Sequence, residues 1–263
     1  MNEDEKYLFD LTGYLIVRQL LTTEEVARLN EAIDHHSNEL QERKDSLAGG
    51  SPALSGTSHR LDMGDMLSWE KPWCEPFRAL LAHPGIKPYL DAILGAGYRL
   101  DHGPGLIAME EGCEGGTLHG GGVERPDFSE AYFFKNGRIY TGLTVVEYML
   151  ADEGPGEGGV AVLPGSHKAN LPCPKGIRWW EEHREMVVEV NAKAGDALIF
   201  TEALTHGTLP WKGKHQRRAL LYKLSPGFQA YSDGAHTVSY PDFIEDMSPE
   251  QRAVMQAPHY RSS

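Results

Sequence analysis

Hydrophobic residues in the first hundred positions recur with the period of an α-helix. Apolar side chains over 20–40 fall near one helical face, and Thr22 and Glu25 have the spacing of a capping box at its start. A second apolar stripe covers 86–94 and ends at Gly95, a typical C-terminal cap. The pattern predicts at least two amphipathic helices before the middle of the chain.

From about residue 98 the period changes to short runs rich in β-branched and aromatic residues, separated by Gly, Pro and Asp. Seven or eight such runs without intervening helices favour a sandwich or jelly roll over a parallel α/β sheet. The runs are YRLDHG, GLIAMEEG, RIYTGLTVVEYMLAD, GGVAVLPGSH, EMVVEVNA, DALIFTEA and RRALLYKLSPG.

No repeat and no low-complexity linker divides the chain, so we predict a single domain with a mainly β core. About 1–96 would form a helical buttress and about 97–228 the core. The remainder, 229–263, predicts an extended tail with a short helix from Ser248. A polar, glycine-rich stretch from Ser46 predicts an exposed loop.

Composition narrows the classes of partner. Among 263 residues, 40% are hydrophobic and 24% are charged, as in an ordinary globular protein, and the formal net charge is −13. A nucleic-acid backbone or an anionic membrane surface would require clustered Lys and Arg. We therefore expect no nucleic-acid and no membrane partner, whereas a small anion held by local cations stays compatible with this charge.

Cysteine usage and the N-terminal residues bear on the compartment. Cys74, Cys113 and Cys173 are widely spaced and odd in number, which argues against a disulfide framework and a zinc ribbon. The acidic start MNEDEKYLFDLTG lacks the basic and apolar regions of a signal peptide, and no apolar run is long enough to span a bilayer. We expect a cytoplasmic protein.

Two of the twelve histidines stand in segments that suggest chemistry. His119 is followed at once by three glycines in GTLHGGGVERPD, and His206 follows the apolar strand of GDALIFTEALTHGTLP. The chain then turns and returns on a strand that carries Arg217, so histidine and guanidinium could face one cavity. Thr208 would point to the same side as His206 if that stretch is extended.

A buried arginine needs a carboxylate, because its fixed fork of donors matches one. If the protein supplies none, a small dicarboxylate ligand could bind Arg217, and Thr208 could add a hydrogen bond. The spacing alone leaves open the alternative that Arg217 pairs with an acid of the protein.

Four segments in this order resemble the phytanoyl-CoA dioxygenase family of iron(II)- and 2-oxoglutarate-dependent oxygenases. FDLTGYLIVRQLLTTEEVARLNEAI is similar to the opening strand and helix of the family, and GGVAVLPGSHKANLP to its strand followed by P-G-[ST]-H. GDALIFTEALTHGTLP resembles the strand that leads to the distal iron histidine, and RRALLYKLSPG the strand of the 2-oxoglutarate arginine.

The resemblance implies a double-stranded β-helix, a jelly roll of two four-stranded sheets, with Fe(II), 2-oxoglutarate and dioxygen at its open mouth. The family ligands are His-x-Asp and a distal His. By position the histidines match His119 and His206, and the arginine and hydroxyl that hold the far carboxylate of 2-oxoglutarate match Arg217 and Thr208. Arg218 is the alternative if the strand register is shifted by one residue.

The sequence departs from the family at the carboxylate, because Gly121 stands where the family has Asp. One interpretation is an iron site with an open position; some 2-oxoglutarate enzymes with Gly or Ala there bind chloride and halogenate aliphatic carbons. A second is loss of the iron site, which would leave a non-catalytic jelly-roll binding protein.

A third interpretation is that another acid replaces the missing ligand. Glu124 and Asp127 lie in a polar loop, whereas Glu147 shares a strand face with apolar residues, where a carboxylate is costly unless it is paired or binds a metal. Glu147 is therefore the candidate third ligand, and an ion pair is its alternative role.

We predict from these residues an oxygenase that hydroxylates an aliphatic C–H bond of a small molecule. The loops 44–61 and 120–138 are the expected specificity loops. The acidic chain offers no basic patch for the phosphates of coenzyme A, so the sequence leaves the substrate open.

Overall fold

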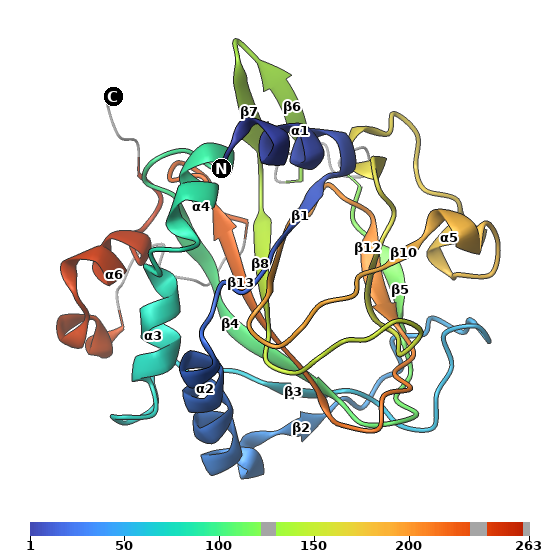
Figure 1. Cartoon of the computed structure of the whole chain (residues 1–263), viewed down its shortest axis with the longest axis horizontal. Coiled ribbons are helices and arrows are strands. Elements are labelled where there is room, and N and C mark those ends of the chain that lie inside the picture. Colours follow the sequence, from blue (N-terminus) through green and yellow to red (C-terminus); the bar gives the residue numbers. More distant parts are fainter. Residues whose placement is uncertain (122–129, 232–240, 260–263) are drawn as a thin grey trace.

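Two antiparallel sheets form the centre of the computed structural model, which describes residues 1–121, 130–231 and 241–259 (Figure 1). The larger sheet has the strand order β1-β11-β8-β13-β4-β3-β2. Its strands are β1 (Tyr14–Val17), β2 (Gln41–Glu42), β3 (Leu61–Met63), β4 (Arg99–Met109), β8 (Thr144–Met149), β11 (Ala197–Thr201) and β13 (Arg217–Ser225). The predicted mainly β class is confirmed.

The smaller sheet has the order β10-β9-β12-β5 and lies opposite the larger one (Figure 1). Its strands are β5 (Gly116–His119), β9 (Gly159–Val162), β10 (Val188–Glu189) and β12 (His206–Leu209). A separate hairpin of β6 (Tyr132–Lys135) and β7 (Arg138–Thr141) projects beyond the sheets, next to α1 (Glu3–Thr12). The short helix α5 (Lys175–Arg178) lies on the side of the smaller sheet.

Alternation along β8 separates the two apolar layers of the molecule. Val145 and Met149 belong to the cluster between the sheets, together with Val160 of β9. Tyr148 points to the opposite face of the larger sheet and packs in the cluster with the helices. Because side chains alternate along a strand, Glu147 shares the inner face with Val145 and Met149, and it is buried.

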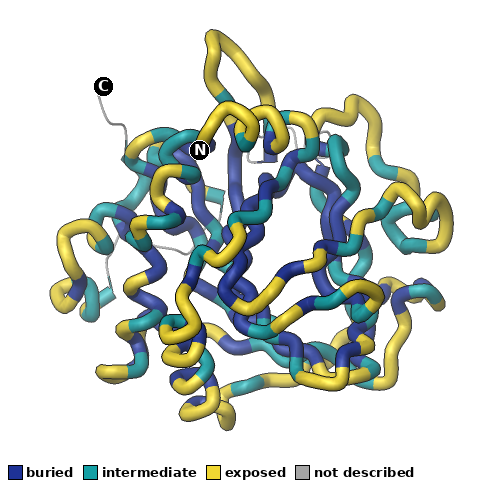
Figure 2. The backbone as a smooth tube through the Cα atoms, viewed as in Figure 1, coloured by how far each residue is buried: buried dark blue, intermediate teal, exposed yellow. Residues whose placement is uncertain are grey.

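Helices cover the outer face of the larger sheet (Figure 1). Leu29, Phe77, Leu90 and Val254 each belong to the apolar cluster that joins these helices to the strands. Figure 2 shows the consequence, since buried backbone follows the strands while the outer turns of the helices are exposed. The helices are α2 (Thr23–His35), α3 (Glu75–Leu81), α4 (Lys87–Ile93) and α6 (Pro249–Val254).

Local capping signals correctly marked the ends of three helices. The Thr22 hydroxyl accepts from the Glu25 N–H, and the Glu25 carboxylate accepts from the Thr22 N–H at 2.8 Å, which completes the capping box of α2. Gly95 follows α4 with a φ of +87°, in the left-handed region. Ser248 caps α6 as predicted.

The first 96 residues contribute more than helices. Strand β1 pairs with β11, and β3 pairs with both β2 and β4, so three early strands extend the larger sheet beyond four strands. The family resemblance anticipated β1, whereas β2 and β3 are too short to show a period in the sequence. Among the described residues, none of the helices has the length and apolarity that a membrane span requires.

Candidate metal and anion site

Two histidines from different strands meet at one edge of the smaller sheet. His119 ends β5 and His206 begins β12, and the two residues are direct partners in the antiparallel register. Their ring centroids are 4.3 Å apart, with the ring planes inclined by 55°. The sequence singled out both residues, and the fold brings them into contact.

Hydrogen bonds orient both rings in the same way. The Nδ1 atoms of His206 and His119 lie 2.8 Å and 3.2 Å from the carbonyl oxygens of Leu204 and Thr117. A carbonyl can only accept, so each Nδ1 carries the hydrogen and each Nε2 keeps a lone pair. Burial, followed by the nearby charge of His119, lowers the pKa of His206 to about 4, and the ring is neutral at pH 7.

A third group, Glu202, joins the two histidines. It follows β11 directly, is buried, and places Oε2 3.6 Å from Nε2 of His206. One ligand atom from each of His119, Glu202 and His206 lies within 4.8 Å of the other two. The sequence analysis missed Glu202; the available signal was its position four residues before His206 in FTEALTH.

Charge neighbours keep Glu202 ionised. Burial alone would raise the pKa of this carboxyl, but attraction to His206 in its protonated form and to the Lys223 cation lowers its pKa to about 2. Lys223 Nζ lies 2.8 Å from Oε1, which leaves Oε2 directed toward His206. The cluster therefore combines one buried carboxylate with the Nε2 atoms of two imidazole rings, a donor set that suits Fe(II) and similar divalent metals.

A cavity of about 380 Å³ opens beside this cluster between the two sheets. Arg217 and Thr208 both line it, as the sequence analysis anticipated, and so do His119 and His206. Arg60 of the predicted specificity loop also reaches the cavity. Cationic side chains beside a candidate metal cluster make this cavity suitable for a small anion.

Arg217 is held between two buried carboxylates. Its Nη2 lies 2.7 Å from Oε1 of Glu147, and its Nε lies 2.8 Å from Oε1 of Glu153. Burial raises the pKa of Glu147 to about 7, against the opposing effect of Arg217. The remaining nitrogen, Nη1, contacts the weak acceptor Sδ of Met109 at 3.8 Å.

The proposed third ligand of the sequence analysis therefore occupies a different place. Glu147 forms the ion pair that was its alternative role, and it is not one of the acids in the cluster with His119 and His206. The reason is the cost of a buried charge, which the adjacent Arg217 offsets. The other candidate acids, Glu124 and Asp127, lie outside the described residues.

Arg218 is excluded from the cavity by the strand register. Arg217 lies on the inner face of β13, and Arg218 points to the opposite face, where it reaches Asp34 and Asn30 of α2. The alternative register in which Arg218 would face the anion is therefore wrong.

The two glycines after His119 lie where the end of β5 comes close to the backbone of the segment 202–204. Gly120 and Gly121 have φ values of +85° and +110°. A Cβ on Gly120 would lie 2.5 Å and 2.6 Å from the carbonyl oxygens of Leu204 and Glu202, so only glycine fits there. The Gly121 N–H donates to the Glu202 carbonyl at 3.4 Å.

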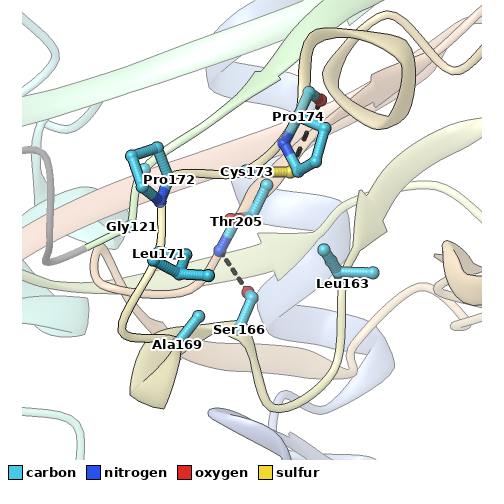
Figure 3. Close-up of a pocket in the computed structure, with 10 residues that line it drawn as sticks. Gly121, Leu163, Ser166, Ala169, Leu171, Pro172, Cys173, Pro174 and Thr205 are labelled. Carbon is cyan, nitrogen blue, oxygen red and sulfur yellow. Dashed lines mark hydrogen bonds between the residues drawn. The ribbon is translucent and has the colours of Figure 1, made fainter.

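An apolar pocket of about 280 Å³ lies on the other side of these glycines (Figure 3). Gly121 and Thr205 line it, and Thr205 directly precedes His206 in the chain. Further lining residues are Ala169, Leu171, Pro172, Cys173 and Pro174. Ser166 fixes the pocket floor by accepting the Thr205 N–H at 2.7 Å. The pocket thus adjoins the chain segment that ends in His206.

Solved structures of metal-dependent enzymes share this fold. HygX from Streptomyces hygroscopicus, solved with nickel, 2-oxoglutarate and hygromycin B bound, matches with a TM-score of 0.69 and 20% identity over 88% of this chain and 89% of HygX. SnoK, an alpha-ketoglutarate-dependent carbocyclase from nogalamycin biosynthesis, matches with a TM-score of 0.64 and 13% identity over 100% and 94%. At these identities the similarity shows that this chain shares the fold of these proteins.

The sequence itself identifies the family. The family model for phytanoyl-CoA dioxygenase matches residues 9–219, and the chain belongs to this family. None of the curated proteins compared with the chain matches it.

Proposed function

We propose that this protein is a non-haem iron(II)- and 2-oxoglutarate-dependent oxygenase that hydroxylates an aliphatic C–H bond of a small molecule. The observation that carries the proposal is the contact between His119 and His206 at a cavity lined by Arg217 and Thr208. The family and the solved relatives with iron, nickel and 2-oxoglutarate bound support it.

The residues fit a divalent metal because both rings offer Nε2 and both are oriented by backbone carbonyls. When bound there, iron and 2-oxoglutarate together would supply the activation of dioxygen and the C–H chemistry. The protein contributes ligands whose tautomers are fixed in advance and, at His206, a buried ring that is neutral at pH 7.

Arg217 and Thr208 are the proposed partners of the far carboxylate of 2-oxoglutarate. Nη1 of Arg217 is the guanidinium nitrogen that neither Glu147 nor Glu153 engages, so it is the donor that we assign to the incoming carboxylate. Protonation of Glu147 would leave Arg217 with one charged partner and strengthen this contact. Anion binding in this site is therefore linked to the protonation of a neighbouring acid.

The apolar pocket beside Gly121 is the proposed place for part of the substrate. Leu163, Leu171 and Pro172 give it an apolar wall, which suits an aliphatic group. The loops 44–61 and 120–138 remain the predicted specificity elements. The second loop includes residues that the structure does not describe.

Two alternative functions make different demands on the site. A halogenase needs an open metal position for chloride, and a binding protein without an iron site needs none of the histidine geometry. The pairing of His119 with the buried, carbonyl-oriented ring of His206 favours a metal enzyme over a binding protein, since burying an imidazole without a ligand is costly.

Anaerobic titration with Fe(II) and 2-oxoglutarate tests the proposal. We expect the weak visible charge-transfer band of the chelate, loss of the band in His206→Ala, and formation of succinate when air is admitted. Neither band nor succinate in the wild-type protein would overturn the assignment as an oxygenase. A His215→Ala variant, altered at an exposed histidine, is the control and should behave as the wild type.

A further inference from the structure

We propose that Glu202 is the carboxylate ligand of the metal site, in place of the aspartate that Gly121 has replaced. The inference rests on the proposed function, because it concerns the same metal. It assigns the third ligand to the segment before the distal histidine, whereas the family pattern places that ligand after the proximal one.

The positions of the donor atoms carry the proposal. Oε2 of Glu202 lies 3.6 Å from Nε2 of His206, and the donor atoms of Glu202, His206 and His119 lie within 4.8 Å of one another. A metal ion with bonds of about 2.1 Å holds adjacent ligand atoms at about 3 Å, so small side-chain rotations would close the site. Glu147, by contrast, forms an ion pair with Arg217.

The glycines explain how Glu202 comes this close. Any side chain at position 120 would collide with the carbonyl oxygens of Glu202 and Leu204, so Gly120 permits the segment 202–204 to lie against the end of β5. Gly121 donates its N–H to the Glu202 carbonyl. The residue at the family's aspartate position therefore binds the backbone of the acid that we assign as its replacement.

The charges around Glu202 are those of a ligand. The carboxylate is buried, and Lys223 engages Oε1 at 2.8 Å while Oε2 stays on the side of His206. Carboxylates that bind a metal are commonly held in place by hydrogen bonds from neighbouring groups. In Glu202 one oxygen would bind the metal, and the other is held by a cation. Lys223 is thus a positioning residue for Glu202.

The assignment also bears on the type of reaction. A metal-bound Glu202 would supply the protein carboxylate whose absence the halogenase alternative requires. Oxygen transfer, rather than transfer of a halide, is then the reaction that the complete ligand set supports.

Calorimetry with Co(II) and the absorption spectrum of bound Co(II) test the ligand without turnover. We expect Glu202→Gln to weaken Co(II) binding at least about tenfold and to change the spectrum. Glu114→Gln is the matched control, because Glu114 is a buried, hydrogen-bonded glutamate outside the cavity lining, and it should bind Co(II) as the wild type does.

Different failures have different meanings. If Glu202→Gln binds Co(II) like the wild type while His206→Ala does not, Glu202 is not a ligand and the proposed oxygenase stands. If the wild-type protein binds neither Co(II) nor Fe(II), both proposals fail. Should Glu202→Gln not fold, a crystal structure of the wild type with Co(II) decides. A Co–O distance of about 2.0–2.2 Å to Glu202 supports the proposal. A bound Co(II) that makes no bond to the Glu202 carboxylate overturns it.

Discussion

His119 and His206 are directly opposed residues of the β5–β12 ladder, and their rings lie 4.3 Å apart. The backbone pairing of two short strands thus fixes the separation of the two candidate ligands. A site built on strand register is rigid, because a shift of one residue would send either side chain to the other face.

Removal of either imidazole should therefore abolish most metal binding. We expect His119→Ala and His206→Ala each to lower the affinity for Mn(II) by more than about tenfold, since loss of a group that merely supports a ligand already costs 10–100-fold. Isothermal titration calorimetry measures this change. Equal Mn(II) affinity in both variants and the wild type would place the metal elsewhere.

The binding of 2-oxoglutarate should weaken as the pH rises through about 7. Burial raises the pKa of Glu147 to about 7, so this group is neutral below that pH and negatively charged above it. The charged form neutralises Arg217 and repels an incoming carboxylate. The apparent Kd of 2-oxoglutarate, titrated anaerobically with Fe(II), should thus be severalfold higher at pH 8 than at pH 6.

Substitution of Glu147 separates this effect from the titration of other groups. Glu147→Gln should bind 2-oxoglutarate more tightly at pH 8 and lose most of the pH dependence, whereas Glu185→Gln, a change at an exposed acid, should keep it. A steep pH dependence in Glu147→Gln would show that another group controls the anion site.

Strand patterns and capping residues predicted most of the fold because these signals are local. The capping box at Thr22, the turn at Gly95 and the apolar alternation around Glu147 each appear within a few neighbouring residues. Strands β2 and β3 have only two or three residues, so no periodicity marked them. They pair with each other, and β3 joins the sheet by pairing with the distant segment β4.

In the candidate site, too, the residues marked by local motifs were predicted, and the residue placed by a long-range contact was missed. His119, His206, Arg217 and Thr208 were anticipated from motif and spacing, and the structure brings all four to one cavity. Glu202 was missed because its proximity to His119 arises from contact between the segments around 120 and 202. Such a contact, made where glycine lets two backbones approach, leaves no periodic trace in a sequence.

Gly120→Ala should destabilise the protein and disturb the metal site together. A Cβ at this position meets two backbone oxygens at 2.5–2.6 Å, and the φ of +85° is unfavourable for alanine. Gly137→Ala is the matched control, because Gly137 has a φ of +76° and no atom within 4 Å of its added Cβ.

Both variants should lose about 1 kcal/mol of unfolding free energy from the left-handed backbone. Gly120→Ala should lose a further ~1–3 kcal/mol from the collision with residues 202 and 204. Urea denaturation gives the difference between them, and Mn(II) affinity should fall in Gly120→Ala alone. Equal stabilities of the two variants would mean that the segment 202–204 moves away freely.

Cys173 should be the first of the three thiols to react in the folded protein. It lines the apolar pocket and is partly exposed, whereas Cys74 and Cys113 are buried. Burial also raises the pKa of both buried thiols, that of Cys113 to about 11, and so reduces their thiolate fraction. Iodoacetamide at pH 8, followed by peptide mass spectrometry, should place the first adduct on Cys173.

The same reaction can report occupancy of the pocket. A small molecule that enters beside Gly121 and Leu171 would cover the Cys173 thiol and slow its alkylation, while alkylation in urea, where all three thiols react, would be unchanged. A panel of aliphatic compounds can therefore be ranked by protection before any turnover is known. Labelling of Cys74 or Cys113 as fast as Cys173 in the native protein would contradict the described burial and the pocket with it.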